Sequence, residues 1–283
     1  MREPILDKPE NSFGYTSKVS VNQAQKAKFL EFAGETARLA GAQTLPFFRV
    51  NTDVENKRTD GHFDPVTEAD RTAERTIRDA IERTFPSHGI YGEEYGHKPG
   101  NGLTWVIDPI DGTRAFMAGM LHWGVLLALF DGETPIVGAM YQPYTDELFL
   151  GDGEVTHLIR GQDKRVLRTS TCEDISSARL GTTGYDWFSA EDLVRFEHLK
   201  SAVQAYRLGG DCYLYGAVAL GSVHIGTDAS LNAYDIQALI PIVTGAGGVV
   251  TTYDGGNPSM GGAVVATANP VLHRQVLAVL QTA

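Results

Sequence analysis

The stretch Trp105-Val-Ile-Asp-Pro-Ile-Asp-Gly-Thr113 decides how we interpret the rest of the chain. Its three leading apolar residues predict a short buried strand, which the proline after Asp108 should end. Gly112 allows a tight turn, so Asp108 and Asp111 are expected together at the carboxyl end of the strand. Two carboxylates suit a divalent cation, and the free N–H groups of a helix that begins at Thr113 suit phosphate. An Asp-rich turn with a helix cap explains this stretch alone about equally well.

The composition is that of an ordinary globular protein with one large or two modest domains. The 283 residues carry a net charge of −11 and no basic cluster, which argues against a nucleic-acid surface. The two cysteines, Cys172 and Cys212, lack metal-type spacing and fit a reducing compartment. The N-terminus lacks a signal-peptide core, and no apolar run approaches membrane-spanning length. We therefore expect a cytoplasmic protein with no membrane partner.

The first half predicts an α+β arrangement with an antiparallel sheet. Apolar residues recur at helical spacing after Asn22, and Thr67 with Asp70 forms a capping-box pattern ahead of a second apolar stripe. Three apolar runs between turn residues then predict a meander. The polar segment 51–62 is expected to be a loop. The expected helices are 22–40 and 67–86, and the expected strands are 89–92, 105–107, 124–130, 135–141 and 147–150. Residues 44–50 are expected to form a strand or an extended segment.

The second half alternates strands and helices, which predicts an α/β arrangement. We place the division between the halves at residues 165 and 166, where the sequence changes character. A loop is expected at 228–234, and Pro241 should kink or shorten the helix that Asp235 opens. The other expected helices are 192–204, 213–220 and 270–280, and the expected strands are 180–183, 205–208, 223–226, 249–253 and 263–268.

Several acidic residues lie at predicted element boundaries, where active-site residues are often found. They are Asp64, Glu93 with Glu94, Asp108 with Asp111, and Asp235. So many carboxylates in one place would need cations, as in a two- or three-metal phosphohydrolase. Taken singly, Asp64 is more simply a turn residue, and the two glutamates are more simply an exposed acidic turn.

Together these motifs resemble the inositol monophosphatase superfamily of Mg²⁺-dependent, lithium-sensitive phosphatases. The stretch at 105–113 carries most of the resemblance. The supporting motifs are Asp64-Pro-Val-Thr-Glu-Ala-Asp70, Gly92-Glu-Glu94, and Tyr234-Asp235 followed by Gly245-Ala-Gly-Gly248. Within the superfamily, Arg207-Leu-Gly-Gly-Asp-Cys-Tyr213 and residues 235–248 resemble the histidinol-phosphate phosphatase branch. The resemblance implies a layered αβαβα sandwich of the inositol monophosphatase and fructose bisphosphatase type, assembled as a homodimer.

The resemblance also implies roles for the motif residues and makes 1–165 the metal-binding half. Two or three Mg²⁺ ions are implied. The first would be held by Glu93, Asp108 and the Ile110 carbonyl, and the second by Asp108, Asp111 and Asp235. Glu93 would also steady a weaker third ion through water. Asp64 and Thr113 would orient and deprotonate the attacking water. Asp111 and the N–H groups of Gly112 and Thr113 would bind the phosphate.

The same resemblance makes 166–283 the substrate-binding half. Gly210, Asp211, Cys212 and Asp228 would line the organic part of the substrate. The two carboxylates would favour the cationic groups of L-histidinol phosphate over a neutral polyol. Asp211 is explained at least as well as a helix N-cap, and Asp228 stands where the family more often has the longer Glu. Inositol phosphate or another small sugar phosphate is the nearest alternative substrate. A non-catalytic metal-binding regulatory homologue is a remote alternative.

Overall fold

An eight-stranded sheet forms the centre of the N-terminal half. The structure is a computed structural model that describes residues 18–50, 55–56 and 65–282. The strands are β3 (Gly89–Gly92), β4 (Gly96–Lys98), β5 (Thr104–Asp111), β6 (Gly124–Phe130), β7 (Pro135–Gln142), β8 (Glu147–Gly151), β9 (Thr156–Arg160) and β10 (Asp163–Val166). Their order is β10-β9-β8-β7-β6-β5-β3-β4, and all pairs are antiparallel except β3 with β5. The predicted meander is confirmed.

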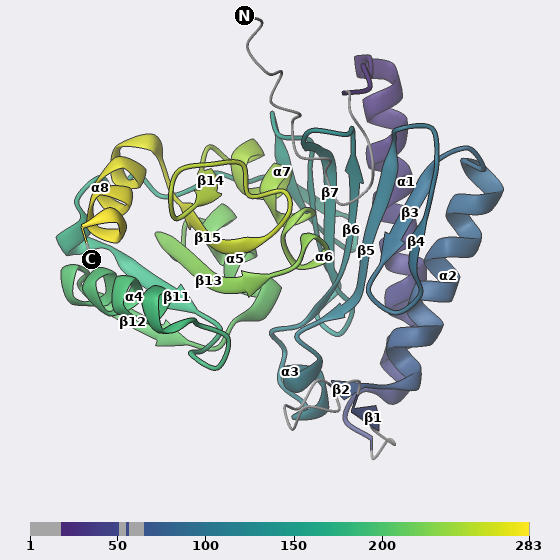
Figure 1. Cartoon of the computed structure of the whole chain (residues 1–283). Helices are drawn as coiled ribbons and strands as arrows, with labels where there is room; N and C mark the ends of the chain where they lie inside the picture. Colours follow the sequence, from purple (N-terminus) through teal and green to yellow (C-terminus); the bar gives the residue numbers. More distant parts are fainter. Residues whose placement is uncertain (1–17, 51–54, 57–64, 283) are drawn as a thin grey trace, which may run out of the picture.

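Two long helices, α1 (Gln23–Thr44) and α2 (Glu68–Thr84), cover the outer face of this sheet (Figure 1). Each begins with a capping box, and the one predicted for Thr67 with Asp70 is confirmed. Their apolar faces bury side chains such as Ile77 against Trp105 of β5. Full burial of an aliphatic side chain stabilises the fold by about 1.5–3 kcal/mol. Within the described ranges, no helix has both the length and the hydropathy that crossing a bilayer requires.

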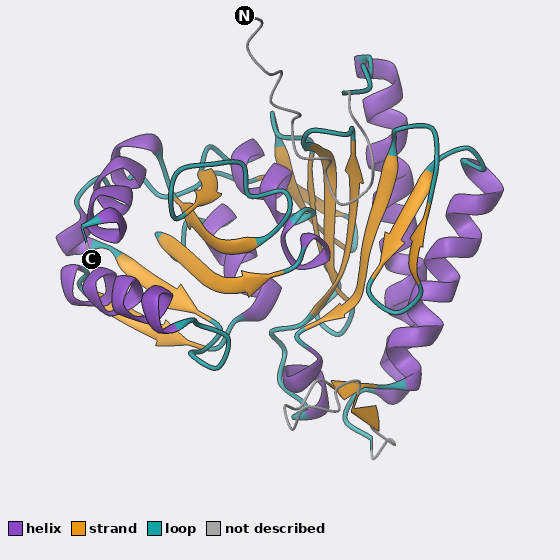
Figure 2. Ribbon diagram, viewed as in Figure 1, coloured by secondary structure: helices purple, strands orange, loops and turns teal. Residues whose placement is uncertain are grey.

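A five-stranded sheet forms the centre of the C-terminal half. Its strands are β11 (Arg179–Thr182), β12 (Ala205–Leu208), β13 (Ile225–Leu231), β14 (Val249–Thr252) and β15 (Gly262–Thr267), in the order β12-β11-β13-β15-β14. The helices α4 (Ala190–Ala202) and α8 (Pro270–Gln281) cover its outer face, as Figure 2 shows. Phe196 of α4 and Val276 of α8 are fully buried in the cluster beneath them.

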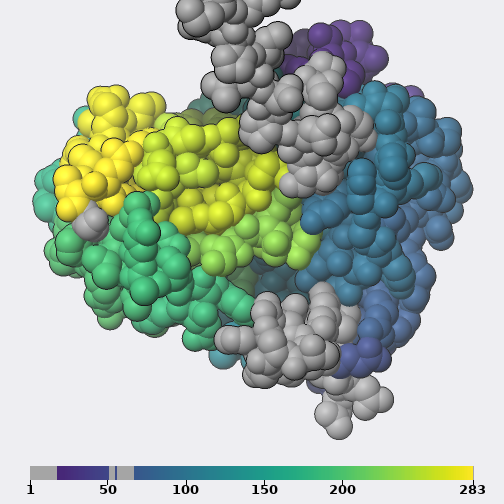
Figure 3. Space-filling view, in the orientation of Figure 1, coloured from purple at the N-terminus to yellow at the C-terminus, as the bar shows by residue number. Residues whose placement is uncertain are grey.

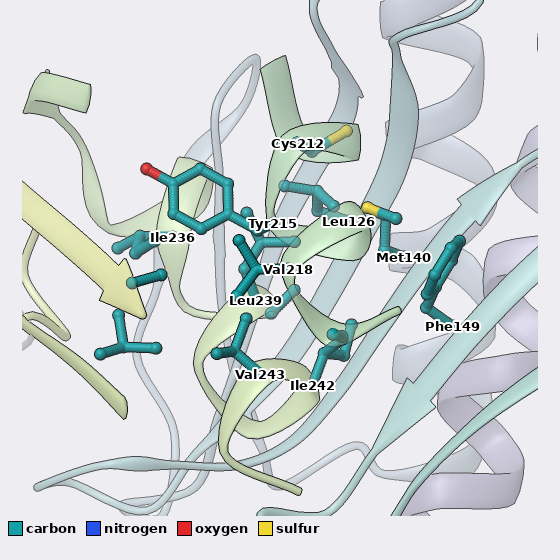
Figure 4. Packing of buried hydrophobic residues seen from close by; sticks show 14 of the residues in the cluster. Leu126, Met140, Phe149, Cys212, Tyr215, Val218, Ile236, Leu239, Ile242 and Val243 are labelled. Atoms are coloured by element: carbon teal, nitrogen blue, oxygen red, sulfur yellow. The ribbon is translucent and has the colours of Figure 1, made fainter. Parts of the chain in front are cut away.

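The helices α5 (Asp211–Ala219), α6 (Ala233–Ile236) and α7 (Leu239–Gly245) lie between the two sheets (Figure 1). The segment between α6 and α7 packs closely against the first sheet, because a Cβ added to Gly138 of β7 would lie 2.0 Å from the Ala238 carbonyl oxygen. Figure 4 shows the shared core, in which Tyr215, Val218, Leu239, Ile242 and Val243 face Leu126, Met140 and Phe149. The layers therefore follow the predicted αβαβα order, and the predicted fold class is confirmed.

Figure 3 shows one face of the molecule, on which the two halves lie in direct contact. Beneath the surface they share the core described above. The division at residues 165 and 166 stays a prediction, although the first sheet includes Val166. The strand or extended segment expected at 44–50 is wrong for Leu45–Phe47, which forms a short 3₁₀ helix, η1, because Pro46 fixes φ near its helical value. A second such turn, η2, is Ile175–Ser177, and the short strands β1 (Glu55–Asn56) and β2 (Pro65–Val66) pair with each other.

Two element ends also differ from expectation. The proline at 109 does not end β5, which continues to Asp111 through a shift of register against β6. Prolines are tolerated at such irregularities because no regular ladder hydrogen bond is lost. The loop expected at 228–234 is wrong for its first four residues, which belong to β13. The predicted effect of Pro241 is confirmed, since the chain forms the short helices α6 and α7 in place of one long helix.

Candidate active site

A cavity of about 370 Å³ opens between the two halves at the end of β5. Its walls come from β5, the short helix α3 (Thr113–Met117), the segment after β11, the start of α5, the end of β13 and α6. Most of the residues singled out from the sequence line it. They are Glu93, Asp108, Ile110, Asp111, Gly112, Thr113, Asp211, Cys212, Asp228 and Asp235.

Three predicted metal ligands converge in this cavity. Carboxylate oxygens of Asp108, Asp111 and Asp235 all lie within 4.8 Å of one another. Asp108 and Asp111 stand on either side of the register shift in β5, which turns the strand end toward the cavity. Asp235 comes from α6 in the other half, where its Oδ2 accepts a hydrogen bond from the Asn232 N–H at 2.6 Å. Both halves therefore contribute to one acidic cluster.

The electrostatics of this cluster fit a hard cation. Burial raises the pKa of Asp111 well above its usual range, and the carboxylates of Asp211 and Asp235 raise it further. The Asp111 Oδ1 accepts a hydrogen bond from the Cys212 N–H at 2.7 Å, which fixes the side chain. Several carboxylate oxygens gathered in this way are the ligand set that Mg²⁺ and Ca²⁺ prefer.

The remaining predicted ligands surround this cluster. Glu93 follows β3 and lines the cavity, although it lies outside the group of three close carboxylates. The Ile110 carbonyl accepts a hydrogen bond from the Thr113 hydroxyl at 3.0 Å. Gly112 has a φ of +85°, and a Cβ there would lie 2.8 Å from the His122 carbonyl oxygen, so the predicted glycine turn is confirmed. Asp64 lies outside the described residues.

The predicted substrate contacts divide into two groups. Asp211, Cys212 and Asp228 line the cavity, whereas Gly210 lines a neighbouring apolar cavity of about 380 Å³. The Cys212 thiol is buried in the shared core. A contact between substrate and Gly210 therefore finds no support in the geometry. The Cys212 N–H donates to Asp111, and the contact of Cys212 with substrate stays a prediction.

Asp228 is buried and already has three donors. Its carboxylate accepts hydrogen bonds from the Thr182 hydroxyl at 3.0 Å, the Thr183 N–H at 2.7 Å and the Tyr215 hydroxyl at 3.1 Å. Burial raises the pKa of Asp228 to about 7. Its predicted contact with substrate stays a prediction, and these donors favour a structural role.

The sequence profile of the Inositol monophosphatase family matches residues 25–283, which include every described residue of this site. The chain belongs to the inositol monophosphatase family. Members of this family are metal-dependent phosphatases that hydrolyse phosphate monoesters, and the chain is an enzyme of that class. The predicted family and enzyme class are confirmed.

Individual relatives of this chain carry different phosphatase names. The chain is 34% identical to the histidinol-phosphatase of Chlorobaculum parvum, over 89% of this chain and 96% of that protein. It is also 34% identical to the bifunctional phosphatase IMPL2, chloroplastic, of Arabidopsis thaliana, over 81% of this chain and only 65% of that protein. An inositol monophosphatase from Zymomonas mobilis has a similar structure, with a TM-score of 0.80 and 33% identity over 90% of this chain and 98% of that one.

Three residues at or beside this site were not singled out from the sequence, namely Arg114, His122 and Trp187. Asp211 is the first residue of α5, with Gly210 as the N-cap, so the N-cap interpretation of Asp211 is wrong. Its Oδ2 lies 3.0 Å from Nδ1 of His122, a histidine in the loop before β6. The Arg114 guanidinium lies 4.8 Å from the Trp187 ring, and both residues line the cavity. His122 and Trp187 belong to no motif and reach this region only through tertiary packing, whereas Arg114 directly follows the stretch at 105–113.

The His122–Asp211 pair predicts a measurable titration. The hydrogen bond to Asp211 raises the pKa of His122 above 6.5. The pair therefore stabilises the fold fully below about pH 6.5, and this contribution is lost as the pH rises through the higher native pKa of His122. In an NMR titration, Asp211→Asn should lower the pKa of His122. The pKa of His157 in β9 should not move, and an unshifted His122 would contradict the pairing.

Proposed function

We propose that this phosphatase requires Mg²⁺ and hydrolyses L-histidinol phosphate to L-histidinol and phosphate. The position of Asp211 carries the proposal. Its carboxylate lines the same cavity as the acidic cluster, and its Cβ lies 3.0 Å from where a Cβ on Gly112 would be. A leaving group next to the predicted phosphate site would therefore meet a carboxylate. The amine of histidinol is cationic near neutral pH, so this contact would be a charge-assisted hydrogen bond.

Asp108, Asp111 and Asp235 would hold the cation, with Glu93 and the Ile110 carbonyl completing the ligands of a second ion. Bound there, Mg²⁺ would acidify water and neutralise charge on the phosphate oxygens. Thr113 orients its hydroxyl through the bond to the Ile110 carbonyl and would position the attacking water. Asp64 is the proposed proton acceptor. The N–H groups at the start of α3, which the helix leaves without intrahelical partners, would bind the phosphate. The number of ions, lithium inhibition, the homodimer and the cytoplasmic location stay predictions.

Inositol phosphate is the second candidate substrate, and one contact favours it. His122 already neutralises part of the negative charge on Asp211, which leaves less for a cationic leaving group. The three donors on Asp228 weaken the acidic pocket further. The regulatory alternative finds less support, because each predicted carboxylate ligand within the described ranges lines the cavity.

We expect kcat/KM for histidinol phosphate to exceed that for inositol 1-phosphate. A charge-assisted hydrogen bond contributes about 1.5–3 kcal/mol, which corresponds to a preference of roughly tenfold to hundredfold. Asp211→Asn should reduce the ratio of the two kcat/KM values. Asp163→Asn removes the same charge from an exposed position in β10 and should leave the ratio unchanged.

Equal kcat/KM for the two substrates would contradict the acidic-pocket argument and favour a general small-phosphate phosphatase. A ratio that Asp211→Asn leaves unchanged would remove Asp211 from substrate recognition. A panel of small phosphate monoesters, assayed with and without Mg²⁺, would separate these outcomes from an absence of activity, which would favour the regulatory alternative.

A further inference from the structure

We propose that Glu74 is a positioning residue that holds the loop carrying Glu93, and that it sets the affinity of the acidic site for its cation. Glu74 belongs to α2 in the outer helical layer and does not line the active-site cavity. The proposal rests on the metal site of the proposed function but not on the identity of the substrate. Glu74 is buried and takes no direct part in the proposed hydrolysis, so its role would be to position Glu93.

The Glu74 carboxylate is completely buried and binds the backbone just after Glu93. Its Oε2 accepts a hydrogen bond from the Glu94 N–H at 2.7 Å, and its Oε1 accepts one from the Tyr95 N–H at 3.2 Å. The Arg78 Nε also donates to Oε1 at 2.7 Å. A buried carboxylate is costly unless such donors surround it. The turn between β3 and β4 is therefore tied to α2 by charge-assisted bonds.

Arg78, one helical turn after Glu74 in α2, contacts the same turn. Its Nη2 donates to the Gly96 carbonyl, and its guanidinium lies 5.8 Å from the Tyr95 ring. The side chain is only 15% exposed, so the ion pair with Glu74 is shielded from water. Glu74 and Arg78 thus satisfy backbone donors and an acceptor within residues 94–96.

The carboxylate of Glu74 also packs closely against Gly92, the residue before Glu93. A Cβ added to Gly92 would lie 2.0 Å from Glu74 Oε1, so no larger residue fits here while Glu74 keeps its position. The N–H of Glu93 itself donates to the Ile107 carbonyl of β5 at 3.3 Å. The backbone at Glu93 is therefore held by Glu74 through the next residue, Glu94, and by β5 through its own N–H, while Glu74 packs closely against Gly92.

This arrangement explains how a half-buried acidic turn can present one carboxylate to the cavity. Without the contacts to α2, the glutamates at 93 and 94 would repel each other and share many conformations. Residues that orient metal ligands from behind typically change metal affinity or activity by about 10–100-fold when mutated. Glu74→Gln keeps the shape of the side chain but replaces one accepting oxygen with an NH₂ group, which faces N–H donors.

The test is Mg²⁺ binding to metal-free protein, measured by calorimetry. Glu74→Gln should raise the Kd for Mg²⁺ by about 10–100-fold. Hydrogen exchange at the N–H groups of Glu94 and Tyr95 should become faster in the metal-free variant. Gly92→Ala should reproduce both effects, because its methyl group displaces the Glu74 carboxylate. Ile81→Ala creates a cavity under the same helix, so it should lower the Tm without changing the Kd.

An unchanged Kd in a folded Glu74→Gln protein would overturn the proposal, while the metal site and the proposed function would stand. An equal loss of Mg²⁺ affinity in Ile81→Ala would also overturn it, since the effect would then reflect stability alone. If the parent protein binds no Mg²⁺, the metal site fails and the role of Glu74 fails with it.

Discussion

Asp108→Asn should be the most damaging single substitution in this enzyme. Asp108 is 2% exposed, belongs to the acidic cluster and would bridge both ions of the proposed site. Loss of one electrostatic contact to a transition state typically lowers kcat by about 10²–10³-fold. A bridging ligand contributes to two ions, so the loss in kcat/KM should reach at least that range. Steady-state kinetics on histidinol phosphate at saturating Mg²⁺ would measure it.

A buried aspartate in the turn that follows β6 of the same sheet provides the matched control. Asp131 is 1% exposed and accepts hydrogen bonds from the N–H groups of Glu133 and Thr134 in the turn after β6. Asp131→Asn should lower the Tm but keep kcat/KM near the parent value. EDTA should abolish the parent activity, and Li⁺ should inhibit it. A fully active Asp108→Asn, or full turnover in excess EDTA, would refute the metal proposal.

Thr113→Ala should lower kcat by about 10²–10⁴-fold, the range typical of a lost general acid–base contribution. Its KM should change little, because Thr113 would act on the attacking water and not on the organic part of the substrate. The structure supports this assignment, since the bond to the Ile110 carbonyl fixes the hydroxyl beside the acidic cluster.

Thr113→Ser is the matched variant because it retains the hydroxyl and can keep the same bond. It should retain most of the activity that Thr113→Ala loses. Pre-steady-state measurements of phosphate release would show whether the hydrolytic step itself has slowed. A kcat for Thr113→Ala close to that of the parent enzyme would remove Thr113 from the mechanism.

The parts of the site that sequence could predict are those encoded by neighbouring residues. Asp108 and Asp111 share one strand end, and Gly112 needs a positive φ, so a local pattern describes all three. The capping boxes of α2 and α6 are local for the same reason. Asp235 was a candidate from its element boundary, but its place beside Asp108 came from the family resemblance and not from spacing.

The contacts that sequence could not predict cross between layers. Glu74 reaches the turn after β3 only because α2 packs on the first sheet. His122 and Asp211 are 89 positions apart and meet where α5 lies against the end of that sheet. The apolar composition of 44–50 fits a strand and a 3₁₀ turn equally well, and Pro46 favours the 3₁₀ turn.

The acidic cluster should lower the free energy of unfolding of the metal-free enzyme. Asp108 and Asp111 belong to the first sheet and Asp235 to the middle layer, so their mutual repulsion acts across the shared core. Occupancy by a cation would turn that repulsion into a cross-link. It would stabilise the folded state by about 2.7 kcal/mol at a free concentration of 100 times Kd. Selection for phosphate hydrolysis would therefore keep carboxylates that lower the stability of the metal-free protein, and Asp111→Asn should raise its Tm while lowering the activity of the enzyme.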